Sequence, residues 1–339
     1  MNQFRIGINL IFILILFCFT NVTNFAKSAA KADSTKQDFM IIDLHIHNGF
    51  VSNGNKLELS NFEYFTQRHI NTFLLPLPLD NSKTENLYLR IKDEIEQLRL
   101  LSKETGTFRV IDSAKLIDAN TKIDKPQVVF CIEYFRGVFN GSLEDLSNYH
   151  DLGIRYITLI DNESDRIFEK DNLSLFGEKL IRKMNETNIL IDISHLSDDQ
   201  KLAVINFSNS PVIVSHSNAR KVADLSYNLS DKVIKRLGQK KGYVFVSFNQ
   251  NGLYDGKVTD INAIDQFINH IDYLVKFLGF DNVGIGTDYQ ANGKYVPQKL
   301  NEITVYNEIK EKLLKRGFSD ENVDKIMGNN ILKLLNCSN

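Results

Sequence analysis

The feature that most constrains the fold is a repeated alternation, after residue 38, of short apolar runs with longer amphipathic segments. The runs are rich in Ile, Val, Phe and Tyr and contain few polar residues. This pattern is typical of strands that are buried on both faces of a parallel sheet. About eight runs can be counted, at residues 40–45, 72–77, 128–132, 154–160, 189–193, 212–214, 243–248 and 283–286.

The segments between the runs have the spacing of amphipathic helices. In 86–105, for example, Leu87, Ile91, Ile95 and Leu98 recur at intervals of three or four residues. Further helices are predicted at 142–150, 173–184, 197–207, 230–237, 261–278 and 300–316, with closing helices at 320–335. Serines that precede four of these segments are candidate N-caps, namely Ser142, Ser197, Ser230 and Ser319.

Eight strands that alternate with helices over this length predict a TIM-type (β/α)8 barrel, an α/β fold, as a single domain at residues 31–339. A doubly wound open sheet is the alternative. Against it, no Gly-x-Gly-x-x-Gly motif and no P-loop follows the first run. The pattern therefore favours the barrel.

Residues 1–30 have the order of a secretory signal peptide. Arg5 precedes an apolar run at 6–19, and small residues follow at 28–30. The run is short for a membrane span, which takes roughly 20 residues. An uncleaved N-terminal anchor is the alternative. Either way we expect an exported protein, in a periplasm, at a cell surface or in the medium.

Charge and cysteine content exclude several other classes. The formal net charge is -2, and cleavage after residue 30 would remove two of the 40 cations and leave 38 minus 42, or -4. Without a basic run that contains aromatic residues, nucleic-acid binding is not expected. Cys18 lies in the leading segment, and the other two cysteines, Cys131 and Cys337, do not make a disulfide framework.

Polar side chains that can bind metal follow five of the apolar runs, at the point where each strand should end. The C-terminal ends of barrel strands meet on one rim, where active sites form. Four of the seven histidines lie at these strand ends, together with two carboxylates: His45, His47, Glu133, His195, His216 and Asp288. The sequence therefore predicts a metal site on that rim.

The spacing of these residues predicts two ions. His45 and His47 are two residues apart, so on a strand both side chains point to one face. Imidazole and carboxylate together suit zinc and its neighbours. Glu133 could bridge two ions, and His195 with His216 could complete the second. Ions roughly 3.5–4 Å apart lower the pKa of a bridging water and polarise a carbonyl. Asp288 would act beside that water as general base or proton shuttle.

Each of these residues also has a structural interpretation, because a lone histidine at a strand end is more often a hydrogen-bonded structural residue. We assign that role to His69, His150 and His270. Asp288 could instead form a salt bridge at the rim. Asp43 and Asp192 are expected to support the ligands rather than to bind ions themselves.

The motifs around these residues resemble those of the membrane (renal-type) dipeptidases, peptidase family M19 of the amidohydrolase superfamily. The resemblance runs from about residue 40 to the C-terminus, and its most specific parts are 214–220 (VSHSNAR) and 228–231 (NLSD). The stretches 150–159, 192–195 and 284–288 are also similar to family motifs. The resemblance implies a zinc-dependent barrel that hydrolyses dipeptides, often with a D-residue at the C-terminal side.

The resemblance also implies roles for single residues. The catalytic residues would be Glu133, as the bridge between two Zn²⁺ ions, and Asp288, which would handle the proton and the substrate amine. The histidines would divide into two pairs, with His45 and His47 on one zinc ion and His195 and His216 on the other. The family is commonly dimeric, but the sequence leaves open whether this chain forms a homodimer. The roles deduced from spacing and those implied by the resemblance agree.

Three positions depart from the family pattern. His47 lies where the family usually has aspartate, and imidazole can replace a carboxylate as a ligand. Asp161 lies where the family has a histidine that polarises the scissile carbonyl, and a carboxylate stabilises no oxyanion unless protonated. Tyr227 replaces an arginine that holds the substrate carboxylate, and tyrosine cannot form that bidentate charged clamp. Arg220, Arg155 or Arg136 could compensate from elsewhere.

The sequence thus predicts retained metal chemistry with altered substrate recognition, in which Asp161, Tyr227 and Arg220 are the candidate substrate contacts. The leading hypothesis is a two-zinc hydrolase of dipeptides or a related small amide. A second hypothesis is an amidohydrolase-type enzyme that acts on another small amide, a lactone or an ester. A third is a binding protein that has kept the fold without catalysis.

Overall fold

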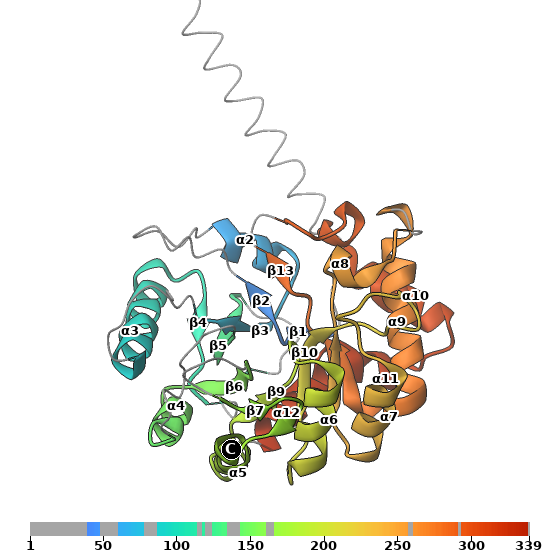
Figure 1. Ribbon diagram of the computed structural model, residues 1–339. Coiled ribbons are helices and arrows are strands. Elements are labelled where there is room, and N and C mark those ends of the chain that lie inside the picture. The colour runs from blue at the N-terminus through green and yellow to red at the C-terminus, as the bar shows by residue number, and fades with distance from the viewer. Residues whose placement is uncertain are drawn as a thin grey trace, which may run out of the picture. The chain divides into compact units, whose positions relative to one another are not determined.

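The computed structural model describes residues 39–47, 60–77, 87–113, 117–118, 124–133, 143–160, 166–256, 260–290 and 293–337. In this part of the chain, parallel strands form one sheet in the order β1-β3-β5-β6-β9-β10-β11-β12, with helices around it (Figure 1). The strands of this sheet and the pair beyond its rim are β1 (Ile42–Asp43), β2 (Ile46–His47), β3 (Thr72–Pro76), β4 (Arg109–Val110), β5 (Gln127–Ile132), β6 (Ile154–Thr158), β9 (Leu190–Asp192), β10 (Ile213–Ser217), β11 (Tyr243–Val246), β12 (Val283–Ile285) and β13 (Tyr289–Gln290).

The first and last strands of the sheet meet, which closes the barrel. Leu44 N donates to Ile285 O at 2.9 Å, and Asp288 N donates to His45 O at 3.0 Å. Beyond these bonds β2 pairs in parallel with β13, with Ile46 opposite Tyr289. An open doubly wound sheet would leave its two edge strands apart. The (β/α)8 barrel is therefore confirmed, and the open-sheet alternative is wrong.

Helices follow most of the strands, and their N-caps agree in part with the predictions. Ser197 forms a capping box with Gln200, and Ser319 accepts from Asn322 N. Ser230 occupies an N-cap position without a side-chain hydrogen bond, and Ser142 lies outside the described residues. The helices are α2 (Ser60–Gln67), α3 (Leu87–Thr105), α4 (Leu146–Asp151), α5 (Leu175–Glu186), α6 (Asp198–Phe207), α7 (Asp231–Gln239), α8 (Gln250–Leu253), α9 (Ala263–Leu278), α10 (Val305–Lys315), α11 (Asp320–Asp324) and α12 (Asn330–Cys337).

Several predicted boundaries are wrong because apolar spacing continues through turns. The helix expected from 142 begins only at Leu146, after an N-cap at Asp145. The helices expected at 261–278 and 300–316 are each preceded by a short 3-10 turn, η2 (Asp260–Asn262) and η4 (Gln298–Asn301). Two more short elements are the 3-10 turn η3 (Phe280–Asn282) and the π-helical turn η5 (Lys325–Asn329). The hairpin of β7 (Phe168–Glu169) with β8 (Asn172–Leu173) was not expected.

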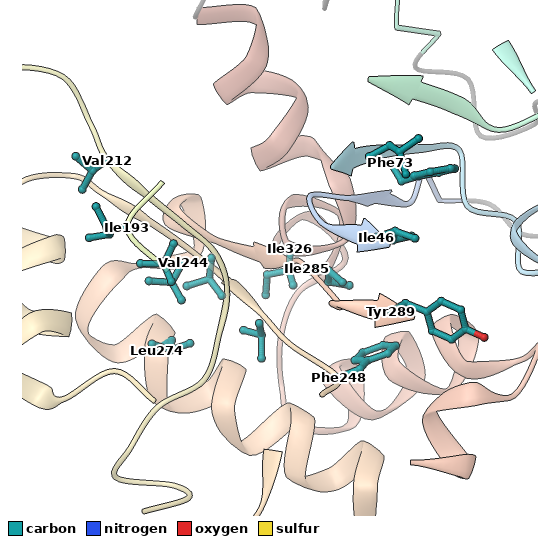
Figure 2. Close-up of a cluster of buried hydrophobic side chains, with 14 of the residues drawn as sticks. Ile46, Phe73, Ile193, Val212, Val244, Phe248, Leu274, Ile285, Tyr289 and Ile326 are labelled. Atoms are coloured by element: carbon teal, nitrogen blue, oxygen red, sulfur yellow. The ribbon is translucent and has the colours of Figure 1, made fainter. Parts of the chain in front are cut away.

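Alternation along each strand separates two apolar layers. On β5, Val128 and Phe130 pack in the large cluster between strands and helices, while Val129 and Cys131 pack in a smaller cluster inside the barrel. Figure 2 shows part of the outer cluster, in which Val244 and Ile285 of the strands lie with Leu274 of α9. Apolar side chains of α12 complete the inner cluster, namely Ile331, Leu334 and Leu335. The predicted closing role of the C-terminal helices is thus confirmed.

The inner layer changes from apolar to polar toward the C-terminal rim, which positions the functional site. After Val129 and Cys131 of β5, the next inward position is Glu133. No helix of the described residues is long and apolar enough to cross a bilayer. The predicted signal segment, residues 1–30, lies outside the described residues, so export stays a prediction.

Candidate metal centre

The two histidines of the first strand segment lie on one face, as their spacing predicted. Ile46, between them, packs in the outer cluster near Phe73 and Tyr289 (Figure 2). The rings of His45 and His47 therefore face the barrel interior, with their Nε2 atoms 3.0 Å apart.

Glu133 lies between two pairs of histidines. Its Oε2 atom is 3.2 Å from His45 Nε2 and 3.1 Å from His47 Nε2. Its Oε1 atom is 2.8 Å from His195 Nε2 and 3.4 Å from His216 Nε2. The five predicted ligands thus come together, and each carboxylate oxygen faces one pair of imidazoles.

A β-bulge in β10 brings His216 into the interior. Val214 pairs with Val244 and Ser217 pairs with Val246, so β10 has one extra residue between these pairs. A bulge re-aims side chains that strict alternation would send to the other face. His216 stacks on His45 with ring centroids 4.1 Å apart. Nothing in the sequence pattern of 212–217 indicated this bulge.

Hydrogen bonds to the Nδ1 atoms orient two of the rings. His45 Nδ1 lies 2.5 Å from the hydroxyl of Tyr156, and His216 Nδ1 lies 2.9 Å from Ser215 Oγ. Both rings therefore turn Nε2 toward Glu133. Tyr156 was missed by the sequence analysis, although a tyrosine within a buried strand needs a partner for its hydroxyl.

Asp288 contacts the same centre from the segment between β12 and β13. Its backbone has a φ of 55°, which is uncommon for a residue other than glycine. Its Oδ1 atom lies 3.3 Å from His47 Nε2, and its Oδ2 atom accepts from Asn249 Nδ2 at 2.7 Å. Asn249 was also missed, although it follows β11 at the rim where the other polar residues were sought.

The pKa values reflect this concentration of charge. Burial alone would raise the pKa of Glu133, but the charge on His45 and hydrogen bonds from His195 and His45 hold it well below its usual range. Asp288 behaves similarly, since its bond to His47 and nearby imidazole charges lower its pKa to about 2 against the effect of burial. Burial disfavours the charged form of His47, yet its bonds to Asp288 and Glu133 raise its pKa to about 10. The cluster thus binds protons that metal ions would displace.

The donor set fits divalent metal. The ligand atoms of His45, His47 and Asp288 lie within 4.8 Å of one another, as do those of His45, Glu133 and His216. Imidazole nitrogens with carboxylate oxygens suit zinc and its neighbours in the first transition series. Rings that are already oriented through Nδ1 leave Nε2 for an ion.

Comparison with known proteins assigns the family. A model of the membrane dipeptidases, peptidase family M19, matches residues 31–338. The chain belongs to this family. Its members are metal-dependent hydrolases, which agrees with the cluster of candidate ligands on the barrel rim.

Individual relatives are distant. Dipeptidase 3 of Rattus norvegicus is 26% identical over 302 residues, which cover 83% of this chain and 60% of the relative. Dipeptidase tcpJ of Claviceps purpurea is 31% identical over 195 residues, or 55% of this chain and 45% of the relative. The chain thus spans about 60% or less of the length of these relatives.

Solved structures share the fold. An amidohydrolase from Pseudomonas aeruginosa superposes with a TM-score of 0.74 at 20% identity, over 91% of this chain and 98% of that chain. A metallopeptidase from Rhodobacter sphaeroides, liganded with a phosphinate mimic of the dipeptide L-Ala-D-Ala, has a TM-score of 0.68 at 19% identity, with coverage of 88% and 99%. At these identities the likeness supports the barrel fold alone.

Of the three predicted substrate contacts of this membrane dipeptidase family member, two lie in the described part of the chain and one does not. Tyr227 is 49% exposed and near enough for the charge of Asp288 to contribute, with burial, to raising its pKa to about 12. Arg220 forms an ion pair with Asp198 at 3.0 Å and donates to the carbonyl of Ser226. Asp161 lies outside the described residues. Their roles toward substrate stay predictions.

The alternative arginine Arg155 does not reach the rim. Arg155 donates to the carbonyls of His150 and Asp112, at the opposite end of β6 from the metal centre. Arg136 lies outside the described residues. Arg155 is therefore not placed as the missing carboxylate clamp.

The two supporting carboxylates lie beneath the ligands, as expected. Asp43 Oδ1 accepts from His45 N at 3.0 Å and from Thr287 N at 2.9 Å, so it joins the first and last strands where the barrel closes. Burial is the main reason that the pKa of Asp43 is raised to about 6. Asp192 accepts from Ser194 N and Ser215 N, the residues directly before His195 and His216.

His270 of α9 has a structural role. Its Nδ1 atom accepts from Ala219 N at 3.1 Å, and its Nε2 atom lies 2.8 Å from Leu253 O, to which it donates. It thereby joins the segment after β10 to α8 behind the metal centre. Burial lowers its pKa from 6.5 to about 4, although the bond to Leu253 acts in the opposite direction.

This lowered pKa predicts a pH dependence of stability. Unfolded His270 takes up a proton near pH 6.5, whereas the folded residue stays neutral down to about pH 4. The stabilisation is complete above pH 6.5 and is lost as pH falls toward 4, by about 3 kcal/mol. In urea unfolding of the metal-free protein, His270→Gln should be less stable at pH 8 and lose less stability between pH 6.5 and 4. Equal pH slopes would contradict the assignment.

Proposed function

We propose that this chain is a two-ion metallohydrolase, with zinc as the expected metal, that cleaves the amide bond of dipeptides. The observation that carries the proposal is Glu133, whose two oxygens each face a pair of imidazole Nε2 atoms. A carboxylate whose two oxygens each face a pair of imidazole nitrogens can bridge two metal ions that those imidazoles bind.

Different residues of the chain would have different roles in the reaction. Metal ions held by these residues would supply an acidified water and a Lewis acid that polarises the scissile carbonyl. Glu133 holds the two ligand pairs together, with His45 and His47 on one of its oxygens. Asp288 is unprotonated at neutral pH and therefore can accept a proton and return it to the leaving amine. Asn249 fixes the orientation of the Asp288 carboxylate.

Metal analysis with a substrate panel tests the proposal. The purified protein should contain two equivalents of metal and hydrolyse L,L- or L,D-dipeptides. A chelator should abolish the activity, and zinc should restore it. Two equivalents of metal without turnover of any dipeptide would exclude the peptide substrate but keep a two-ion hydrolase. A protein that binds no metal at neutral pH would contradict the proposal and favour a binding function.

A second candidate, hydrolysis of another small amide, a lactone or an ester, is favoured by Tyr227. This half-exposed side chain lies near Asp288, and its Cε2 atom would be 3.2 Å from a Cβ added at Gly252 of α8. A phenol presents one hydrogen-bond donor to substrate, whereas a free carboxylate is best bound by a bidentate guanidinium. A substrate without a free carboxylate would suit such a site.

Tyr227→Arg should shift preference toward substrates with a free carboxylate. A charge-assisted hydrogen bond contributes about 1.5–3 kcal/mol, which corresponds to roughly 10–100-fold in kcat/KM. We expect that gain for a dipeptide over the same dipeptide with an amidated C-terminus. Tyr295→Arg adds the same charge at another exposed tyrosine and should leave the ratio near that of the unaltered protein. An equal change in both variants would indicate general electrostatic attraction.

A further inference from the structure

A buried carboxylate beneath the second pair of histidines accepts five hydrogen bonds. Asp192 Oδ1 accepts from Ser194 N at 3.1 Å, from Ser194 Oγ at 2.6 Å and from Ser215 N at 2.9 Å. Its Oδ2 atom accepts from Thr158 Oγ1 at 2.7 Å and from Ser215 Oγ at 2.6 Å. Asp192 itself is fully buried. Each serine directly precedes a candidate metal ligand in the sequence, in the pairs Ser194-His195 and Ser215-His216.

The direction in which the Ser215 hydroxyl donates its hydrogen determines whether His216 Nδ1 donates or accepts a hydrogen bond. A hydroxyl has one hydrogen to donate, and at 2.6 Å from Asp192 Oδ2 the two oxygens would repel each other without it. The hydrogen bond to an ionised acceptor is also the stronger one. Ser215 therefore has only lone pairs left for His216 Nδ1, at 2.9 Å.

This arrangement selects one tautomer of His216. Because Ser215 Oγ can only accept, His216 must carry its hydrogen on Nδ1. Its Nε2 atom, 3.4 Å from Glu133 Oε1, then has a free lone pair directed into the metal centre.

We propose that Asp192, acting through the Ser215 hydroxyl, fixes His216 in the tautomer that can bind an ion, so that Ser215 is a positioning residue of the second ion site. The inference rests on the proposed two-ion function. Ser194 contacts the backbone of His216, whereas Ser215 contacts its imidazole. The Ser194 hydroxyl donates to Asp192, lies 3.0 Å from Ser215 Oγ and accepts from His216 N at 3.4 Å.

The test compares Ser215→Ala with Ser194→Ala in the full chain. Histidine nitrogens are observed by NMR in metal-free, ¹⁵N-histidine-labelled protein, with His216 assigned from the signals missing in His216→Gln. The unaltered protein and Ser194→Ala should show the Nδ1–H form of His216. Ser215→Ala should show a mixture with the Nε2–H form. In zinc titration, Ser215→Ala should lose 10–100-fold in affinity for the second equivalent, about the effect of removing such a hydrogen bond.

Ser217→Ala is a matched control on the same strand. Ser217 follows His216, is also buried and bonds to Tyr227 O at 3.5 Å without contacting Asp192. Zinc affinity and the His216 tautomer should be unchanged in this variant. The Nδ1–H form retained in Ser215→Ala, or lost equally in Ser194→Ala, would overturn the inference. Because the NMR measurement needs neither metal nor turnover, it stays decisive even if the proposed hydrolase function fails.

Discussion

Glu133→Gln should reduce bound metal from two equivalents to at most one and lower hydrolysis by at least about 10³-fold. The amide keeps the shape of the side chain but replaces one oxygen, which faces two imidazole Nε2 atoms, with a hydrogen-bond donor. One pair of histidines then lacks its shared anionic partner. Loss of ~4 kcal/mol of charge stabilisation by the ions corresponds to the expected factor in rate.

Metal content by elemental analysis and kcat/KM on the best substrate of the panel measure this effect. Glu169→Gln, on the exposed β7–β8 hairpin, makes the same chemical change away from the centre and should alter neither quantity. Circular dichroism should show that both variants remain folded. Two equivalents of metal in Glu133→Gln would contradict the bridging role of this carboxylate.

Gly286→Ala should destabilise the protein by about 3 kcal/mol or more and weaken the second ion site. A Cβ at this position would lie 1.9 Å from Ser215 O and 2.9 Å from Phe245 Cβ. The nearer atom belongs to the backbone at the β10 bulge, so it cannot move away by a change of rotamer. Overpacking of a core costs typically 1–3 kcal/mol when side chains can adjust, and a backbone clash costs more. Displacement of Ser215 would also move His216.

Urea unfolding and zinc titration separate the two consequences. Gly317→Ala is the control, because a Cβ there would meet nothing within 4 Å while φ is +90°. It measures the cost of left-handed backbone alone, about 1–2 kcal/mol, and should leave zinc affinity unchanged. A stable Gly286→Ala variant with two tightly bound ions would show that β10 can shift without effect on the site.

Local sequence patterns predicted some features of the metal centre and missed others. The His45-Ile46-His47 spacing correctly placed both imidazoles on one face, because strand geometry alternates side chains regardless of what surrounds them. The position of Glu133 after a buried strand was predictive for the same reason. His216 was predicted as a ligand from its place at a strand end, but the extra residue that turns it inward is visible only in the pairing of β10 with β11.

Residues that act through other residues were harder to find. Tyr156 contacts His45, and Asn249 contacts Asp288, from segments that are remote in sequence. The rule that functional residues lie at strand ends could have suggested Asn249, but not Tyr156, which lies within β6. The hydrogen-bond partner of a side chain depends on how the segments pack against each other. The order of residues along one strand does not predict that partner.

The sequence by itself determined the barrel, the rim on which the site forms, and the candidate set of four histidines and two carboxylates. These features follow from apolar periodicity and from the residue types at strand ends. Both can be recognised within a short stretch of sequence. Only the tertiary structure decided that each oxygen of Glu133 faces one histidine pair, that Gly286 makes room for the Ser215 backbone, and that Asp192 orients His216. The physical reason is that register, bulges and hydrogen-bond partners arise when distant segments pack, and their geometry is fixed only in the closed barrel.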